Sequence, residues 1–272
     1  MSSLAYVTDF TSREIPHGGS EQVDDYISRA LDAPITRCKD ITSFDTSKFH
    51  IFSHISTLAP DLVSRIPELD YIVIEHDYKF HATRHPWRFP NSLVPRNELV
   101  NLDLYRNARA IFTQTDDHRN VFERNGIQGN FVSLKSSIWS PADLALLAAL
   151  GTTGKKTYKY VIYDSANWIK NTAKAVSFCR DNNLDFELLG NQPDRETFLG
   201  KMAGYSTLVF FPVARETMCR LVVEARCLNM NVITTKNYGA TLSSWFSLAG
   251  RELVGYQASQ STENLATIRK HL

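Results

Sequence analysis

The chain has 272 residues, of which 43% are hydrophobic and 22% charged, and its formal net charge is +1. This composition is typical of a globular protein, and the overall charge gives no evidence for a nucleic-acid partner. No run approaches the roughly 18 apolar residues that cross a bilayer, the first residues lack signal-peptide features, and the four cysteines show no metal-ligand spacing. We therefore expect a cytoplasmic protein.

Short apolar runs rich in β-branched and aromatic residues occur throughout the chain. Such runs are typical of strands in parallel sheets, which are buried on both faces. In the first half, we predict a helix at 20–32 and strands at 4–10, 49–56, 71–77, 108–115 and 130–135. In the second half, we predict strands at 158–165, 185–190, 207–213, 231–237 and 252–256, with helices at 168–183, 194–205 and 218–230. A final helix is expected at 261–272, with Ser261 or Thr262 as its N-cap.

The alternation of strands and helices predicts an α/β protein with two Rossmann-like domains. The domain boundary is expected at 136–157, where a short helix leads into a Gly/Thr/Lys stretch without apolar periodicity. This gives an N-terminal domain at 1–140 and a C-terminal domain at 155–272. Because such domains bind ligands at the carboxyl ends of their strands, polar residues that follow strands are the candidates for chemistry.

Two glutamates in the second half carry the strongest signal. Glu216 follows the strand predicted at 207–213, Glu224 lies in the next helix, and seven residues separate them. Residues two helical turns apart lie on roughly the same face, and a carboxylate near a helix start is electrostatically favoured. The alternative is a pair of solvated acids on an amphipathic helix.

This glutamate pair, with the small-residue segment LNMNVITTKNYGA after it, resembles the signature of retaining glycosyltransferases of the GT-B fold, group 1 or family-four-like. The resemblance implies that Glu216 faces the donor sugar and that Glu224 hydrogen-bonds the ribose. Arg215 and Thr217, which flank Glu216, are expected to bind the donor as well. It also implies that the two Rossmann-like domains face each other across a cleft and that the second one binds the nucleotide sugar.

The segment YDSANWIKNTAKAV, after the strand predicted at 158–165, is similar to the diphosphate-binding segment of the same family. That family has an Arg and a Lys here, and Lys170 matches the Lys. An ammonium at this point would neutralise the charge on the departing diphosphate. Ser165 and Asn167 stand where the Arg is expected, and Arg215 is its candidate substitute. The alternative for Lys170 is an exposed helix lysine.

Gly18 and Gly19, after the first strand, resemble the family's N-terminal glycine loop and are expected to approach the donor. Glycines let backbone come close to a ligand, and a helix N-terminus offers unpaired N–H donors. A plain turn is the alternative. The segment is not GxGxxG, which argues against a dinucleotide-binding oxidoreductase.

His76 follows the apolar part of the strand predicted at 71–77, and many relatives have a His near this point that contacts the donor sugar. The resemblance therefore implies a catalytic role for His76 beside Glu216 and Lys170. Basic and aromatic residues then alternate over 78–89, a pattern that can hold phosphates and stack on bases. We expect acceptor contacts from four of them, namely Lys79, Arg84, Trp87 and Arg88. A solvated loop with aromatic anchors is the alternative.

The run EHDYKF followed by R-x-P is also similar to small glycosyltransferases of tailed bacteriophages. This makes hydroxymethylated cytosine in double-stranded DNA a candidate acceptor, and the host cytoplasm the location of a viral member. A glycan or a small molecule is the other candidate acceptor.

The resemblance implies a hexosyl- or pentosyltransferase that uses a UDP-linked or similar nucleotide sugar and retains the anomeric configuration. No DxD triplet follows a predicted strand, so transfer is expected to need no metal and no cofactor. Two other functions stay open. A sugar-nucleotide epimerase of the same fold would convert the donor without an acceptor, and a non-catalytic module would bind nucleotide sugar or DNA without turnover.

Overall fold

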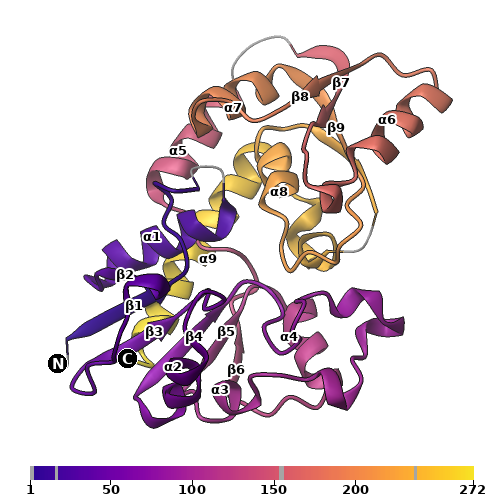
Figure 1. Ribbon diagram of the computed structural model, residues 1–272. Helices are drawn as coiled ribbons and strands as arrows, with labels where there is room; N and C mark the ends of the chain where they lie inside the picture. Colours follow the sequence, from indigo (N-terminus) through magenta and orange to yellow (C-terminus); the bar gives the residue numbers. More distant parts are fainter. Residues whose placement is uncertain (1–2, 16–17, 153–155, 236–237) are drawn as a thin grey trace. The chain divides into compact units, whose positions relative to one another are not determined.

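The structure is a computed structural model that describes residues 3–15, 18–152, 156–235 and 238–272. It consists of two compact units (Figure 1). Unit 1 comprises Met1–Ile138 and Gln260–Leu272, and unit 2 comprises Trp139–Ser259. This division differs from the predicted domains 1–140 and 155–272, because residues 260–272 group with unit 1. Leu265 and Ile268, from this last segment, are buried in a core of unit 1.

Unit 1 is built on a parallel sheet of six strands in the order β2-β1-β3-β4-β5-β6. The strands are β1 (Leu4–Thr8), β2 (Ile35–Arg37), β3 (Phe49–Phe52), β4 (Tyr71–Glu75), β5 (Ile111–Thr113) and β6 (Phe131–Ser133). The helices are α1 (Gly19–Leu31), α2 (Pro60–Arg65), α3 (Leu102–Arg106) and α4 (Asp116–Arg124).

Both faces of this sheet are covered, as the apolar runs predict for parallel strands. Successive side chains on a strand point to opposite faces, so Tyr6 and Val7 of β1 lie in two different cores. The core that holds Tyr6 also contains side chains of α1 and of the end of α9 (Gly250–Arg269). The core that holds Val7 contains side chains of α2, α3 and α4.

Unit 2 has a four-stranded parallel sheet in the order β10-β9-β7-β8. Its strands are β7 (Thr157–Tyr163), β8 (Phe186–Leu189), β9 (Tyr205–Phe210) and β10 (Asn231–Thr234). Its helices are α5 (Pro141–Leu150), α6 (Thr172–Asp181), α7 (Arg195–Ala203) and α8 (Arg220–Cys227). Helices α5, α7 and α8 contribute to the main core, whereas α6 packs against Ile162 and Val209 in a smaller one.

Short 3-10 helices complete the chain: η1 (Cys38–Asp40), η2 (Ile66–Glu68), η3 (Pro86–Arg88), η4 (Pro90–Ser92), η5 (Arg96–Glu98), η6 (Trp168–Lys170), η7 (Gly239–Leu242) and η8 (Ser244–Ser247). Among the described residues, no helix is long and apolar enough to cross a membrane.

Two predictions near the C-terminus are wrong, because 252–256 is not a strand and no helix begins at Ser261 or Thr262. Both segments belong to α9, which begins at Gly250 in a left-handed conformation with φ +54°. A short apolar run fits a strand and a buried helix equally well, and here Leu253 and Val254 pack into a core from a helix. Strand β2 was not predicted, since its sequence ITR is too short to form an apolar run.

Candidate functional site

The carboxyl ends of β7 and β9 form the ligand-binding position that the topology of unit 2 predicts. Strand β7 lies between β8 and β9 in the sheet, so the chain leaves β7 toward one side and later returns on the other. At such a switch point the two loops diverge and leave room for a ligand. The loops here are the one from β7 to α6, which contains η6, and the one from β9 to α8.

Lys170 and Glu216 meet at this switch point, although they are 46 residues apart in the sequence. Lys170 ends η6, Glu216 lies in the loop after β9, and Lys170 Nζ is 2.6 Å from Glu216 Oε1. The side chains are 30% and 18% exposed. Burial opposes the charge on Lys170, but the Glu216 carboxylate outweighs it and raises the pKa of Lys170. The pair is thus charged and reachable from solvent.

Backbone contacts hold the two loops in this arrangement. The Val213 N–H donates to the Ile169 carbonyl at 2.8 Å, and the Asn171 side-chain amide donates to the Phe211 carbonyl at 3.0 Å. On the other side, the Gly239 N–H donates to the Glu216 carbonyl at 3.1 Å. The position of the Lys170–Glu216 pair is therefore set by tertiary hydrogen bonds and not by a single loop.

The other donor residues predicted in unit 2 lie on the same two loops. The exposed Asn167 caps η6 by accepting from the Ile169 N–H at 3.1 Å, and the Ser165 N–H donates to the Thr172 hydroxyl at 3.2 Å. Arg215 is half-buried and Thr217 is buried. Asn167 and Ser165 thus shape the loop that carries Lys170.

Glu224 has a different environment from Glu216. Its Oε1 is 2.9 Å from Arg195 Nη2 and 3.6 Å from Arg220 Nε. Asp143 adds a second carboxylate, 3.1 Å from Arg195 Nε, and the Arg220 guanidinium lies 3.8 Å from the centre of the Trp139 ring. The Glu224 side chain is only 5% exposed. The carboxylate predicted to bind ribose is therefore already neutralised by two half-buried arginines.

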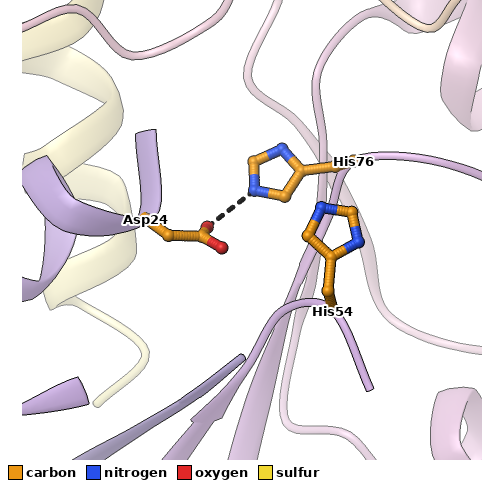
Figure 2. Close-up of side chains that lie close together, drawn as sticks. All are labelled: Asp24, His54 and His76. Atoms are coloured by element: carbon orange, nitrogen blue, oxygen red, sulfur yellow. Dashed lines mark hydrogen bonds and ion pairs between the residues drawn. The ribbon is translucent and has the colours of Figure 1, made fainter. Parts of the chain in front are cut away.

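In unit 1, His76 belongs to a cluster with Asp24 and His54, in which Asp24 and His76 are buried and His54 is half-buried (Figure 2). His76 follows β4, His54 follows β3, and Asp24 lies on α1. His76 Nε2 is 2.7 Å from Asp24 Oδ1, and the rings of His54 and His76 stack with their centres 5.2 Å apart. Sequence reasoning missed Asp24 and His54. His54 follows a buried strand just as His76 does, whereas Asp24 looks like part of a polar helix face.

The charges in this cluster are set by its burial. Burial alone would raise the pKa of Asp24, but the charge and hydrogen bond of His76 outweigh it and lower that pKa to about 2. Hydroxyls of Tyr6 and Thr8 also donate to the Asp24 carboxylate, at 2.7 and 3.0 Å. Burial and the neighbouring His76 lower the pKa of His54 to about 4. At neutral pH the cluster therefore combines a carboxylate with a neutral His54.

The predicted glycine loop directly precedes and begins α1, with Gly18 as the N-cap and Gly19 as the first helical residue. A side chain at Gly18 would meet the carboxylate of Glu21, the movable end of a flexible side chain, so glycine leaves Glu21 its present position. Burial raises the pKa of Glu21. An acid thus lies beside the helix N-terminus that we expected to approach the donor.

One predicted acceptor contact is contradicted by the structure. Lys79 is fully buried, with Nζ 2.6 Å from Glu75 Oε1, and it cannot reach a phosphate on the surface. The prediction failed because Lys79 is buried against Glu75 at the end of β4. Nothing in the polar and aromatic sequence around Lys79 indicates this pairing.

The remaining predicted acceptor residues of this segment differ in how exposed they are. Arg84 is half-buried, pairs with Asp77 at 2.8 Å and also contacts the Ser56 hydroxyl. Arg88 is exposed, and its guanidinium lies 5.7 Å from the centre of the half-buried Trp87 ring. The segment therefore presents less positive charge to solvent than its sequence indicates.

Known structures share this fold, although the chain has no match among known family models or among curated proteins. One is solved as the trehalose-6-phosphate synthase OtsA, with a TM-score of 0.56 and 11% identity over 99% of this chain and 96% of that chain. Another is Anabaena Alr3699/HepE in complex with UDP-glucose, with a TM-score of 0.54 and 13% identity over 98% of this chain and 92% of that chain. HepE with UDP and glucose gives a TM-score of 0.52 at 11% identity, with the same coverage. The predicted fold class, α/β with two Rossmann-like domains of the GT-B kind, is confirmed.

Proposed function

We propose that this protein is a glycosyltransferase that takes a sugar from a nucleotide-sugar donor, with the donor bound at the switch point of unit 2. The observation that carries the proposal is the Lys170–Glu216 pair between the carboxyl ends of β7 and β9. It is supported by the likeness of the fold to OtsA and to HepE, the latter bound to UDP-glucose. A UDP-linked donor is therefore the first to test.

In this mechanism Lys170 and Glu216 act on opposite ends of the bond that breaks. The Lys170 ammonium would stabilise the charge that builds on the leaving diphosphate, and Arg215 would add to it. The Glu216 carboxylate would accept hydrogen bonds from the donor sugar hydroxyls, with Thr217 beside it. We propose retention of configuration through front-face attack by the acceptor hydroxyl, without a metal ion on the donor diphosphate.

For the remaining donor contacts, we propose that Ser165 and Asn167 donate hydrogen bonds to the diphosphate from the loop after β7. In unit 1, the roles of His76, Gly18 and Gly19 in donor binding stay predictions. The role of Glu224 would be indirect, because its pairing with Arg195 ties α8, the helix that follows Glu216, to α7.

For the acceptor, we propose a hydroxyl of a glycan or of a small molecule. The pairing of Lys79 with Glu75 and of Arg84 with Asp77 leaves Arg88, stacked near Trp87, as the main exposed cation of those predicted to contact DNA. A hydroxymethylcytosine acceptor in phage DNA would require transfer that weakens with salt and depends on Arg88. Salt-independent transfer, unchanged in Arg88→Ala, would agree with the smaller acceptor.

The proposed function is tested by incubating the protein with a panel of nucleotide sugars and candidate acceptors, DNA included, and measuring nucleotide release and product mass. We expect acceptor-dependent release of UDP, and loss of it in Glu216→Gln. Conversion of the donor without acceptor would instead indicate an epimerase. Donor binding by calorimetry without any turnover on the panel would indicate a binding module.

A further inference from the structure

The cluster of Asp24, His54 and His76 in unit 1 has the chemistry of a metal site. The atoms that could bind an ion, one from each residue, all lie within 4.8 Å of one another. They come from three separate parts of the chain, α1, the loop after β3 and the residue after β4. Two imidazoles and one carboxylate are a ligand set that suits zinc and its neighbours, whereas magnesium and calcium prefer oxygen ligands.

His54 supplies the observation that points to a missing ligand. Within the part of the chain that the structure describes, its Nε2 is buried and has no hydrogen-bond partner. Figure 2 shows this nitrogen on the side of the ring that faces His76. Buried polar atoms in folded proteins almost always have a partner, and one without a partner calls for an explanation such as an ion.

Each proposed ligand also has a neighbour that could orient it, as ligands in metal sites do. His54 Nδ1, on the other side of its ring, is 3.9 Å from the Asp77 carboxylate. His76 Nδ1 is 2.8 Å from the side-chain amide of Gln114, which can present its oxygen to a protonated Nδ1 if the amide turns over. The hydroxyls of Tyr6 and Thr8 hold the Asp24 carboxylate.

We propose that Asp24, His54 and His76 bind one divalent ion of the zinc class, through the Nε2 atoms of both histidines and a carboxylate oxygen of Asp24. The ion takes the place of the proton between His76 Nε2 and Asp24 Oδ1, and that proton leaves to solvent or moves to Nδ1. Water fills the remaining position, so the site is of the open, three-ligand type.

The distances permit this with small movements. Zinc bonds of about 2.1 Å in a tetrahedron place ligand atoms about 3.4 Å apart. The distance from His76 Nε2 to Asp24 Oδ1 is 2.7 Å and must lengthen, while the longest separation in the cluster, at most 4.8 Å, must shorten. The first distance must grow by about 0.7 Å and the second must shrink by at most about 1.4 Å, changes that rotation of the side chains can make.

The test is binding of Zn²⁺ to the full-length protein, with any affinity tag removed, by calorimetry and by competition with a chromophoric chelator. We expect one site, and visible absorption typical of a four-coordinate ion when Co²⁺ replaces Zn²⁺. Mg²⁺ should not compete. Binding is scored without nucleotide sugar, so the result does not depend on whether the proposed transfer activity is found.

The decisive variant is His54→Ala, because it removes a ligand and leaves the His76–Asp24 hydrogen bond intact. Loss of a supporting neighbour costs roughly 10- to 100-fold in metal affinity, so loss of a ligand should cost at least about 100-fold. His85→Ala, which removes a half-buried histidine outside the cluster, is the matched control and should bind as the wild type does. If His54→Ala fails to fold in circular dichroism, His54→Gln and Asp24→Asn replace it.

Zinc affinity that is equal in His54→Ala and in the wild type would overturn the proposal, as would wild-type binding no tighter than that of the Asp24→Asn variant. The cluster would then be a hydrogen-bonded His–Asp pair with a stacked histidine. A zinc-dependent rise of the melting temperature in the wild type and in His85→Ala, absent in His54→Ala, would support it independently.

Discussion

Glu216 and Glu224 belong to one sequence motif but occupy two different environments. Glu216 lies in a loop, is 18% exposed and pairs with Lys170. Glu224 lies inside α8, is 5% exposed and faces two arginines, with Asp143 balancing the second positive charge. The first carboxylate can exchange its partner for a ligand, whereas the second is committed to the interior of unit 2.

The contribution of an ion pair to the free energy of unfolding differs between the two positions. A partly exposed pair is screened by water and contributes about 0–1 kcal/mol. A buried pair costs much to desolvate, so removing one partner leaves a charge that neither water nor protein neutralises. We therefore expect mutations at Glu216 to affect function and mutations at Glu224 to affect stability first.

The largest expected effect is that of Glu224→Ala. It removes one of the carboxylates that neutralise Arg195 and Arg220, and we expect the free energy of unfolding to fall by roughly 3–5 kcal/mol, nearer the lower figure because Asp143 remains. Urea denaturation followed by circular dichroism measures it. The matched control is Glu216→Ala, which should lose about 1 kcal/mol or less. Equal losses in the two variants would remove the distinction between the two glutamates.

The second largest expected effect is that of Lys170→Ala on the rate of sugar transfer. Lys170→Ala should slow sugar transfer by on the order of 100-fold or more, because the leaving diphosphate loses a charged partner. Its stability should stay within about 1 kcal/mol of the wild type. Single-turnover rates with saturating donor measure the first quantity and urea denaturation the second. An unchanged rate would show that Lys170 serves only to pair with Glu216. Lys174→Ala, on an exposed position of α6, is the control.

A smaller effect concerns pH. Glu216 raises the pKa of Lys170 above its ordinary value of 10.5, so this pair stabilises the fold below that pH and the contribution is lost as pH rises through the raised pKa. The difference in unfolding free energy between the wild type and Lys170→Met should thus be constant from pH 7 to about pH 10 and shrink above it. If this difference in unfolding free energy instead grew toward high pH, the folded state would not raise the pKa of Lys170.

The sequence by itself determined most of the architecture. Apolar runs predicted nine of the ten observed strands, since a strand buried on both faces needs an apolar side chain at nearly every position. The motif around Glu216 and the segment around Lys170 indicated the carboxyl ends of β9 and β7, where the structure brings the two residues together. The likeness of the fold to OtsA and HepE agrees with the GT-B class that these motifs implied.

Tertiary structure decided which polar side chains are exposed to solvent and which are paired with another side chain of the protein. Lys79 and Arg84 look alike in a basic segment, yet one is buried on Glu75 and the other pairs with Asp77. Asp24 looks like a solvated helix residue, yet folding places it against His76. Asp24 and His76 lie on separate elements, whereas Lys79 and Arg84 pair with acids four and seven residues earlier in the sequence. A sequence pattern records neither which side chains a loop brings together nor which faces of two elements meet. The physical reason is that desolvation and pairing depend on distances between side chains in three dimensions, and these are fixed only once the chain has folded.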